Sequence, residues 1–228
     1  MYVIALASQK GGSGKTTLAG HLAIAAERTM SGAVALVDSD PQGSLSDWWN
    51  ARQANTPLFA RCRMAQLATD LERMRAAGVA LVLVDTPPAI LETVVEVIRH
   101  ADLVLVPVQP SPHDLRAAAA TVEFVERLAK PFIFVLNGAT PRARITAEAA
   151  LALSQRGALA PVVVHHRTGF AASMIDGRTV MEIADNGGAE EITELWDYIN
   201  LRFRREFRLV LPDRCADDRH AMRPVTSV

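Results

Sequence analysis

The stretch SQKGGSGKTT, residues 8–17, decides the fold, because an apolar run precedes it and a helical pattern follows it. A glycine-rich turn between a strand and a helix exposes backbone N–H groups to an anion, and the helix dipole attracts the same charge. Gly11, Gly12 and Gly14 let the backbone approach a phosphate without a Cβ clash. The stretch therefore predicts a phosphate-binding loop after the first strand.

Polar side chains complete this predicted nucleotide site. Lys15 would place its charge on the β- and γ-phosphates, the Thr16 hydroxyl can ligate Mg²⁺, and Thr17 can reach the α-phosphate. The common form of the loop is G-x-x-x-x-G-K-[ST], and its first glycine would be residue 9, which is Gln9 here. The expected nucleotide-binding residues of the loop are Gly11, Gly12, Ser13, Gly14, Lys15, Thr16 and Thr17.

Lysine is rare in this chain, which has 3 lysines and 21 arginines, yet two of the lysines lie in this one loop. The spacing of the motif assigns Lys15 to the phosphates. Lys10 precedes the glycines and need not point at the nucleotide of its own loop. From the residues alone, an ordinary surface position for Lys10 stays open.

Short apolar runs alternate with longer helical stretches along the chain. Each candidate strand is continuously apolar, as the strands of a parallel sheet are when both faces are covered. The expected fold class is α/β, a doubly wound and mostly parallel sheet flanked by helices. Expected strands are Tyr2–Ser8, Ala33–Asp38, Ala80–Asp85, Leu103–Val108, Phe132–Asn137 and Val162–His165. Expected helices are Lys15–Thr29, Ser44–Ala54, Gln66–Ala77, Ile90–His100, Pro112–Ala129, Ile145–Arg156 and Ala189–Arg205.

Acidic residues follow two of the expected strands, at the ends where ligands of such sheets bind. The stretch LVDSDPQGS places Asp38 and Asp40 after the second strand, and LVLVDTPP ends a strand in Asp85. Two apolar strands that each end in Asp beside a phosphate loop indicate a metal–phosphate site. For the first pair a helix cap, with Ser44 or Ser46 as the N-cap residue, is an alternative that can coexist with this role.

The loop motif K-G-G-x-G-K-[ST], close to the N-terminus, resembles the deviant Walker A motif of the ParA/MinD family of dimerising ATPases. The likeness covers roughly residues 2–205 and is greatest to short, ParF-like partition ATPases, with residues 1–205 as one P-loop domain and residues 206–228 as a C-terminal tail. The resemblance implies ATP/ADP and Mg²⁺ as ligands. It also implies a nucleotide-sandwich homodimer in which Lys10 reaches the phosphates of the partner's ATP.

The same resemblance assigns roles to the acidic residues. In the match to D-x-D-P-Q, Asp40 orients or activates the attacking water, and Asp38 supports the Mg²⁺ shell. Asp85 fits the Walker B pattern and would hold Mg²⁺ through water. The expected catalytic residues are Lys10, Lys15 and Asp40, and the expected metal residues are Thr16, Asp38 and Asp85.

Two further positions follow from family patterns. Asn137 ends the strand FIFVLNGAT, and an amide can pair with adenine through a donor and an acceptor. An Asn-Gly turn is the alternative for this residue. The segment VPVQPSPHDL resembles the partition branch and makes Asp114 a candidate for the dimer interface.

Members of the partition branch hold nonspecific DNA as ATP-bound dimers, until a ParB-like or cargo-adaptor protein stimulates hydrolysis. The net charge of −1 restricts any DNA contact to a local patch. Arg167 matches a position at which relatives carry a DNA-contacting arginine. Arg202, Arg204 and Arg205 crowd the end of the last helix and can contact phosphates, or they can serve the helix dipole.

A MinD-like membrane-associated ATPase is the alternative. Ile199, Phe203 and Phe207 share a helical face among arginines, but a polar tail follows, and packing on the sheet explains the stripe equally well. Membrane binding is therefore not expected. Cys62 and Cys215 lie far apart without partner spacing, which fits a reducing cytoplasm. The expected location is cytoplasmic and nucleoid-associated.

Overall fold

The computed structural model describes residues 1–89 and 92–206, with side chains described through residue 203. Within this part of the chain, seven parallel strands form one sheet in the order β3-β2-β4-β1-β5-β6-β7. Because the strands run in parallel, their carboxyl ends meet at one edge of the sheet. The strands are β1 (Tyr2–Leu6), β2 (Ala33–Asp38), β3 (Leu58–Ala60), β4 (Val79–Asp85), β5 (Leu103–Val108), β6 (Phe132–Ala139) and β7 (Leu159–His165).

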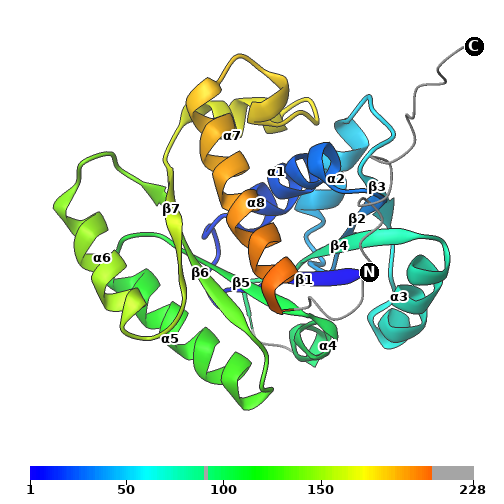
Figure 1. Cartoon of the computed structure of the whole chain (residues 1–228), viewed down its shortest axis with the longest axis horizontal. Helices are drawn as coiled ribbons and strands as arrows, with labels where there is room; N and C mark the ends of the chain where they lie inside the picture. The colour runs from blue at the N-terminus through cyan, green and yellow to red at the C-terminus, as the bar shows by residue number, and fades with distance from the viewer. Residues whose placement is uncertain (90–91, 207–228) are drawn as a thin grey trace, which may run out of the picture.

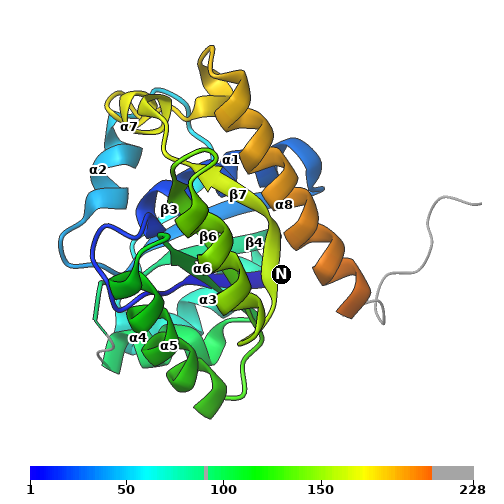
Figure 2. The ribbon, with the colours of Figure 1, turned by 90° about the vertical axis from the view of Figure 1, so that its left-hand side faces the viewer.

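Helices cover both faces of the sheet (Figure 1, Figure 2). One layer contains α1 (Lys15–Thr29), α2 (Ser44–Ala51), α7 (Thr168–Met174) and α8 (Asn186–Glu206), with the short 3₁₀ helix η2 (Val180–Glu182). The other layer contains α3 (Leu67–Ala76), α4 (Glu92–His100), α5 (Pro112–Arg127) and α6 (Arg144–Ser154), with the 3₁₀ helix η1 (Met64–Gln66).

The two covered faces explain the continuous apolar strands. In β1, Ile4 and Leu6 belong to the core under α1 and α8, whereas Val3 and Ala5 belong to the core on the opposite face. Ile4, Ala5 and Leu6 are completely buried, so neither face leaves room for the polar residues of a half-exposed strand. The predicted doubly wound parallel sheet is confirmed.

The predicted strands and helices are all present among the described residues, with ends shifted by a few positions; residues 90–91 of the fourth predicted helix lie outside them. The sequence pattern did not predict β3, α7 or either 3₁₀ helix. β3 pairs with β2 over three residues at the sheet edge, and α7 has seven residues. Neither is long enough to display a hydrophobic period of its own.

The apolar stripe at the end of α8 packs inside the molecule. Ile199 is completely buried, and the ring of Phe203 stacks on that of Tyr2 with the centroids 4.6 Å apart. The interpretation of these two residues as a membrane-facing stripe is therefore wrong, and Phe207 lies outside the described residues. None of the helices in the described part of the chain is long and apolar enough to cross a bilayer. The predicted tail lies beyond the description, apart from Glu206 at the end of α8.

Candidate nucleotide-binding site

The loop between β1 and α1 has the backbone that its glycines predict. Gly12 and Gly14 adopt left-handed conformations, with φ of 74° and 96°, and Gly14 is the N-cap of α1. A Cβ on Gly14 would lie 2.0 Å from the side-chain nitrogen of Asn137. Backbone conformation and close approach therefore each require glycine at residue 14. The N–H groups of the first turn of α1 lack helical acceptors, which makes this turn a receptor for an anion.

Lys15 extends its ammonium group along this loop. The residue is 7% exposed, and Nζ lies 3.3 Å from the carbonyl oxygen of Lys10 and 3.5 Å from that of Ser8. The pKa of Lys15 is lowered, because the effect of burial exceeds the opposite effect of the nearby carboxylates of Asp85 and Asp40. Among the described residues, no carboxylate forms an ion pair with Lys15. A buried cation held only by carbonyl groups is suited to an anionic ligand.

Asp85 meets Thr16 beside this lysine. The Thr16 hydroxyl donates to Oδ2 of Asp85 at 2.5 Å, which joins the start of α1 to the end of β4. Asp85 is 1% exposed, and burial raises the pKa of its carboxyl to about 7. Its Oδ1 is buried without a hydrogen-bond partner in the described part of the chain. A hard divalent cation such as Mg²⁺ takes oxygen ligands, so this residue pair fits one.

Asp38 and Asp40 shape the loop that leads into α2. Asp38 accepts hydrogen bonds from the Asp40 backbone N–H at 3.0 Å, and from the Ser46 N–H and hydroxyl at 2.8 and 2.9 Å. Gly43, rather than a serine, is the N-cap residue of α2, and the Asp38 carboxylate supplies the capping bond from the preceding strand. The support of a metal by Asp38 stays a prediction.

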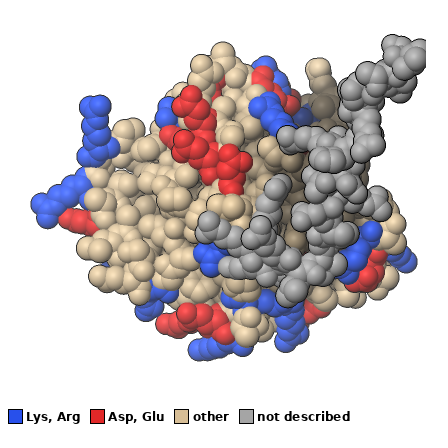
Figure 3. Space-filling view, viewed as in Figure 1, with Lys and Arg blue, Asp and Glu red and all other residues tan. Residues whose placement is uncertain are grey.

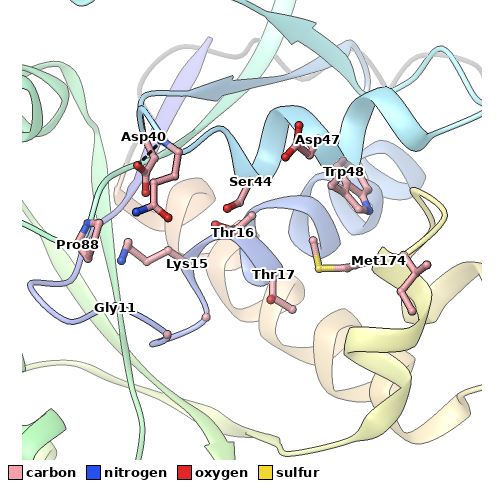
Figure 4. Close-up of a pocket in the computed structure, with 14 residues that line it drawn as sticks. Gly11, Lys15, Thr16, Thr17, Asp40, Ser44, Asp47, Trp48, Pro88 and Met174 are labelled. Atoms are coloured by element: carbon pink, nitrogen blue, oxygen red, sulfur yellow. Dashed lines mark hydrogen bonds between the residues drawn. The ribbon is translucent and has the colours of Figure 1, made fainter.

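Asp40 itself faces the cavity, and its Oδ1 accepts a hydrogen bond from the Gln42 N–H at 3.0 Å (Figure 4). This contact fixes the carboxylate on the side where Lys15 lies. Its predicted role toward a water stays a prediction.

Lys10 is held by its own chain. Its ammonium lies 2.5 Å from Oδ2 of Asp114, whose side chain is 2% exposed, while the Lys10 side chain is 38% exposed. The hydroxyl of Ser111, the N-cap residue of α5, donates to the same oxygen. The predicted contact of Lys10 with a partner's ATP therefore requires the exchange of Asp114 for a phosphate, and it stays a prediction.

Two amides from the sheet hold the phosphate loop from behind. Asn137 donates to the carbonyl oxygen of Ser13 at 2.7 Å, and Gln109 donates to that of Gly12 at 2.9 Å. The amide nitrogen of Asn137 is thus bound to the loop, and the predicted adenine role stays a prediction. The Ser13 hydroxyl is buried without a hydrogen-bond partner among the described residues.

A cavity of about 600 Å³ opens over this loop (Figure 4). Its lining includes Asp40 and six of the seven predicted loop residues, Gly11, Gly12, Gly14, Lys15, Thr16 and Thr17. Toward one end lie Lys15 and Asp40, and toward the other lie Trp48 and Met174. The sequence analysis did not identify Trp48, Met174 or Ile175 as site residues, because their place depends on how α2 and α7 pack.

The family model of the CobQ/CobB/MinD/ParA nucleotide binding domain matches residues 4–205. The chain belongs to this ParA/MinD family. It is 30% identical over 207 residues to "Maintenance of carboxysome distribution protein A" of Halothiobacillus neapolitanus, covering 85% of this chain and 94% of the relative. It is 29% identical over 207 residues to the chromosome-partitioning ATPase Soj of Thermus thermophilus, covering 78% and 71%.

Among solved structures, an ATP complex of a Cyanothece McdA variant superimposes with a TM-score of 0.71 at 16% identity, covering 88% of this chain and 96% of that chain. At this identity the likeness shows the fold. This chain thus has the P-loop fold of ParA/MinD proteins, with the cavity described above at its glycine-rich loop.

The arginines that the family resemblance assigns to DNA have mixed surroundings. Arg167 forms an ion pair with Glu191, a residue of α8, at 2.7 Å. Acidic side chains gather over the first turns of this helix (Figure 3). Arg202 donates to the Tyr198 hydroxyl at 3.4 Å. Arg204 and Arg205 belong to α8, but their side chains lie outside the described residues. DNA binding by these four residues stays a prediction.

Proposed function

We propose that this ParA/MinD family member is a Mg²⁺-dependent ATPase that dimerises around ATP, binds nonspecific DNA and positions a cargo. One observation carries the proposal: the Lys15 ammonium, which lies at the cavity, is bound only by carbonyl groups in the described part of the chain. It lies near the buried carboxylate of Asp85, whose Oδ1 has no hydrogen-bond partner among the described residues. A phosphate chain with its metal ion satisfies both groups at once, because it brings negative charge to the lysine and positive charge to the aspartate.

Each residue of the site has a distinct task in this proposal. Backbone N–H groups after Gly14 and the Lys15 ammonium bind the phosphates and offset their charge. Thr16 and Asp85 would hold Mg²⁺, which neutralises phosphate charge when it is bound, and Asp38 would support that shell. Asp40 orients a water at the terminal phosphate. Hydrolysis of this kind depends on positioning and electrostatics more than on covalent chemistry.

The dimer depends on Lys10 in this proposal. Its side chain is 38% exposed and lies beside the phosphate loop, so it can leave Asp114 when a partner's phosphates approach. Two lysines near one triphosphate are tolerated because the ligand carries several negative charges. ATP would then act as the link between two copies.

A ParB-like or cargo-adaptor protein would stimulate hydrolysis and release the DNA, and the dimer would be located on the nucleoid in the cytoplasm. The similarity to a carboxysome distribution protein favours a large protein complex as the cargo, whereas the similarity to Soj favours a chromosome. Retention of the dimer on DNA at low salt would support this proposal over the membrane-associated alternative. Binding to liposomes without retention on DNA would select the alternative.

Sedimentation tests the ATP-gated dimer directly. We expect Asp40→Ala to sediment as a monomer with ADP and as a dimer with ATP and Mg²⁺, because the substitution blocks turnover and preserves the ATP state. Equal sedimentation in the two conditions contradicts the proposal.

Two lysine variants distinguish binding to the chain's own nucleotide from binding to the partner's nucleotide. Lys10→Ala is expected to keep the monomer's affinity for ADP and to lose the dimer and hydrolysis. Lys15→Ala is expected to lose ADP binding itself. If Lys10→Ala also abolishes monomeric ADP binding, the assignment of Lys10 to the partner's nucleotide is wrong.

A further inference from the structure

His21 is a fully buried residue of α1 whose two ring nitrogens both have partners. Nδ1 lies 2.8 Å from the carbonyl oxygen of Thr17, and Nε2 lies 3.1 Å from the backbone nitrogen of Val180. A carbonyl only accepts and an N–H only donates, so the ring is neutral with its proton on Nδ1. His21 therefore joins the first turns of α1 to η2, 159 positions along the chain.

Helix α2 holds the same segment, residues 177–182, which we call the strap. The indole N–H of Trp48 donates to the carbonyl oxygen of Arg178 at 2.9 Å. Arg52 is the C-cap residue of α2, and its side chain is 5% exposed. Its guanidinium forms two hydrogen bonds to Glu182, at 2.7 and 3.0 Å. A partly buried bidentate pair of this kind fixes both distance and orientation.

The strap continues directly from α7. Met174 and Ile175, at the end of this helix, line the nucleotide cavity, and Ile175 is 81% exposed. The ring of Phe170 in α7 packs edge-on against His21 with the centroids 5.0 Å apart. Arg167 is the N-cap residue of the same helix. Any displacement of the strap therefore moves a wall of the cavity and the predicted DNA contact together.

Helices α1 and α2 begin at two different loops of the nucleotide site, and both hold this one segment. A ligand that shifts one helix against the other must shift or strain the strap, because its bonds to the two helices are short and directed. We propose that His21 is a positioning residue that anchors the strap to the phosphate-loop helix, so that the nucleotide state sets the position of α7. This inference rests on the proposed ATP site and needs neither the dimer nor DNA.

Hydrogen–deuterium exchange over residues 168–182 tests the anchor, with the full chain loaded with Mg-ADP or with Mg²⁺ and a non-hydrolysable ATP analogue. In the Asp40→Ala background, which excludes residual turnover, the two states are expected to differ in protection of this segment. His21→Leu fills the buried site with an apolar side chain that cannot form either hydrogen bond. This variant is expected to lose the difference in protection between the two states. His21→Gln keeps an acceptor for the Val180 N–H, and this variant is expected to retain the difference in protection.

Trp196→Phe is the matched control. This substitution lies in the same core and removes a hydrogen bond to Thr29 at the far end of α1, while it leaves the hydrogen bonds of His21, Trp48 and Arg52 to the strap in place. It is expected to leave the difference in protection unchanged. If His21→Leu does not fold, Trp48→Phe removes the bond from the α2 side to Arg178 and is expected to reduce the difference.

The outcomes separate this inference from the proposed function. Binding of a fluorescent ADP analogue is measured for every variant. Nucleotide binding with equal protection of residues 168–182 in the two states, or a difference that survives in His21→Leu, overturns the anchor alone. Absence of nucleotide binding in the wild type overturns the proposed function as well.

Discussion

Asp85 shows at the scale of one residue how a binding site opposes stability. Its carboxyl is buried, one oxygen has no partner in the described part of the chain, and its pKa is raised from 3.8 to about 7. At pH 8 the folded state therefore carries a buried charge that the unfolded state exposes to water. We expect Asp85→Asn to raise the free energy of unfolding of the nucleotide-free protein at pH 8, measured in urea with EDTA.

The sign of this effect depends on pH in a defined way. Between pH 4 and 7 the unfolded carboxyl is ionised while the folded one keeps its proton, so wild-type stability falls as the pH rises. The advantage of Asp85→Asn should accordingly shrink between pH 8 and pH 5. The same variant should lose the Mg²⁺-dependent gain in nucleotide affinity, and a variant that is less stable than wild type at pH 8 would contradict the reasoning.

His21 predicts the opposite pH dependence. Burial lowers its pKa from 6.5 to about 4, so the unfolded chain binds a proton between these values while the folded chain does not. Wild-type stability is expected to fall by roughly 3 kcal/mol as the pH falls from 6.5 to 4, relative to His21→Gln, which cannot take up that proton. Paired unfolding curves across this window measure the difference. Parallel curves would show that folding does not lower the pKa of His21, and would contradict the prediction.

At the scale of elements, Asn137 belongs to the phosphate loop as much as to β6. Its hydrogen bond to the Ser13 carbonyl positions the loop, whereas a base contact would act only on a nucleotide. We expect Asn137→Ala to weaken pyrophosphate and ADP binding by the same factor, about 2- to 10-fold for one lost hydrogen bond. Isothermal titration measures both ligands. Gln109→Ala, which removes the more exposed bond to Gly12, is the matched control and should have a smaller effect.

A loss confined to ADP would instead assign Asn137 to adenine. The discrimination is clean because pyrophosphate has no base, while both ligands use the same loop. The position of Asn137 also explains why residue 14 must be glycine. A Cβ on Gly14 would lie 2.0 Å from the amide nitrogen of Asn137.

The elements that the sequence predicted well are those whose pattern is set by burial alone. β4 and β5 are continuously apolar because each lies between two other strands and under two helical layers, and α1 begins at a glycine loop with a known geometry. α7 has no such signal, since its seven residues depend on contacts with α1 and η2. Elements that depend on contacts with residues distant in sequence cannot be predicted from local hydrophobic periodicity.

At the scale of the whole molecule, the parallel topology explains why the convergence of Lys15, Asp40 and Asp85 was predictable and the cavity's far wall was not. Lys15, Asp40 and Asp85 come from different segments, but these follow or end the neighbouring parallel strands β1, β2 and β4, whose carboxyl ends must meet. Trp48 and Met174 both line the cavity because of how α2 and α7 are placed, and a single sequence does not specify that placement. The role of Asp114 as a partner for Lys10, 104 positions away, was hidden for the same reason.

The charge distribution of the whole molecule leads to a prediction for DNA. Arg167 is bound to Glu191, and Asp185 and Glu190 lie close enough to raise its pKa further. A DNA phosphate must therefore compete with an internal carboxylate for this arginine. We expect Glu191→Gln to increase the affinity of the ATP-bound dimer for nonspecific duplex DNA, and Arg167→Ala to decrease it.

The salt dependence distinguishes a direct contact from a general change in charge. Because each phosphate contact releases counterions, loss of Arg167 should reduce the slope of log affinity against log salt by about one for each subunit. Arg99→Ala removes an exposed arginine from the opposite helical layer, and it should leave that slope unchanged. If all three variants bind DNA with the wild-type slope, Arg167 does not touch the phosphates. The DNA contact would then have to come from elsewhere, with the arginines of α8 as the remaining candidates, because a chain of net charge −1 cannot bind DNA without a local basic surface.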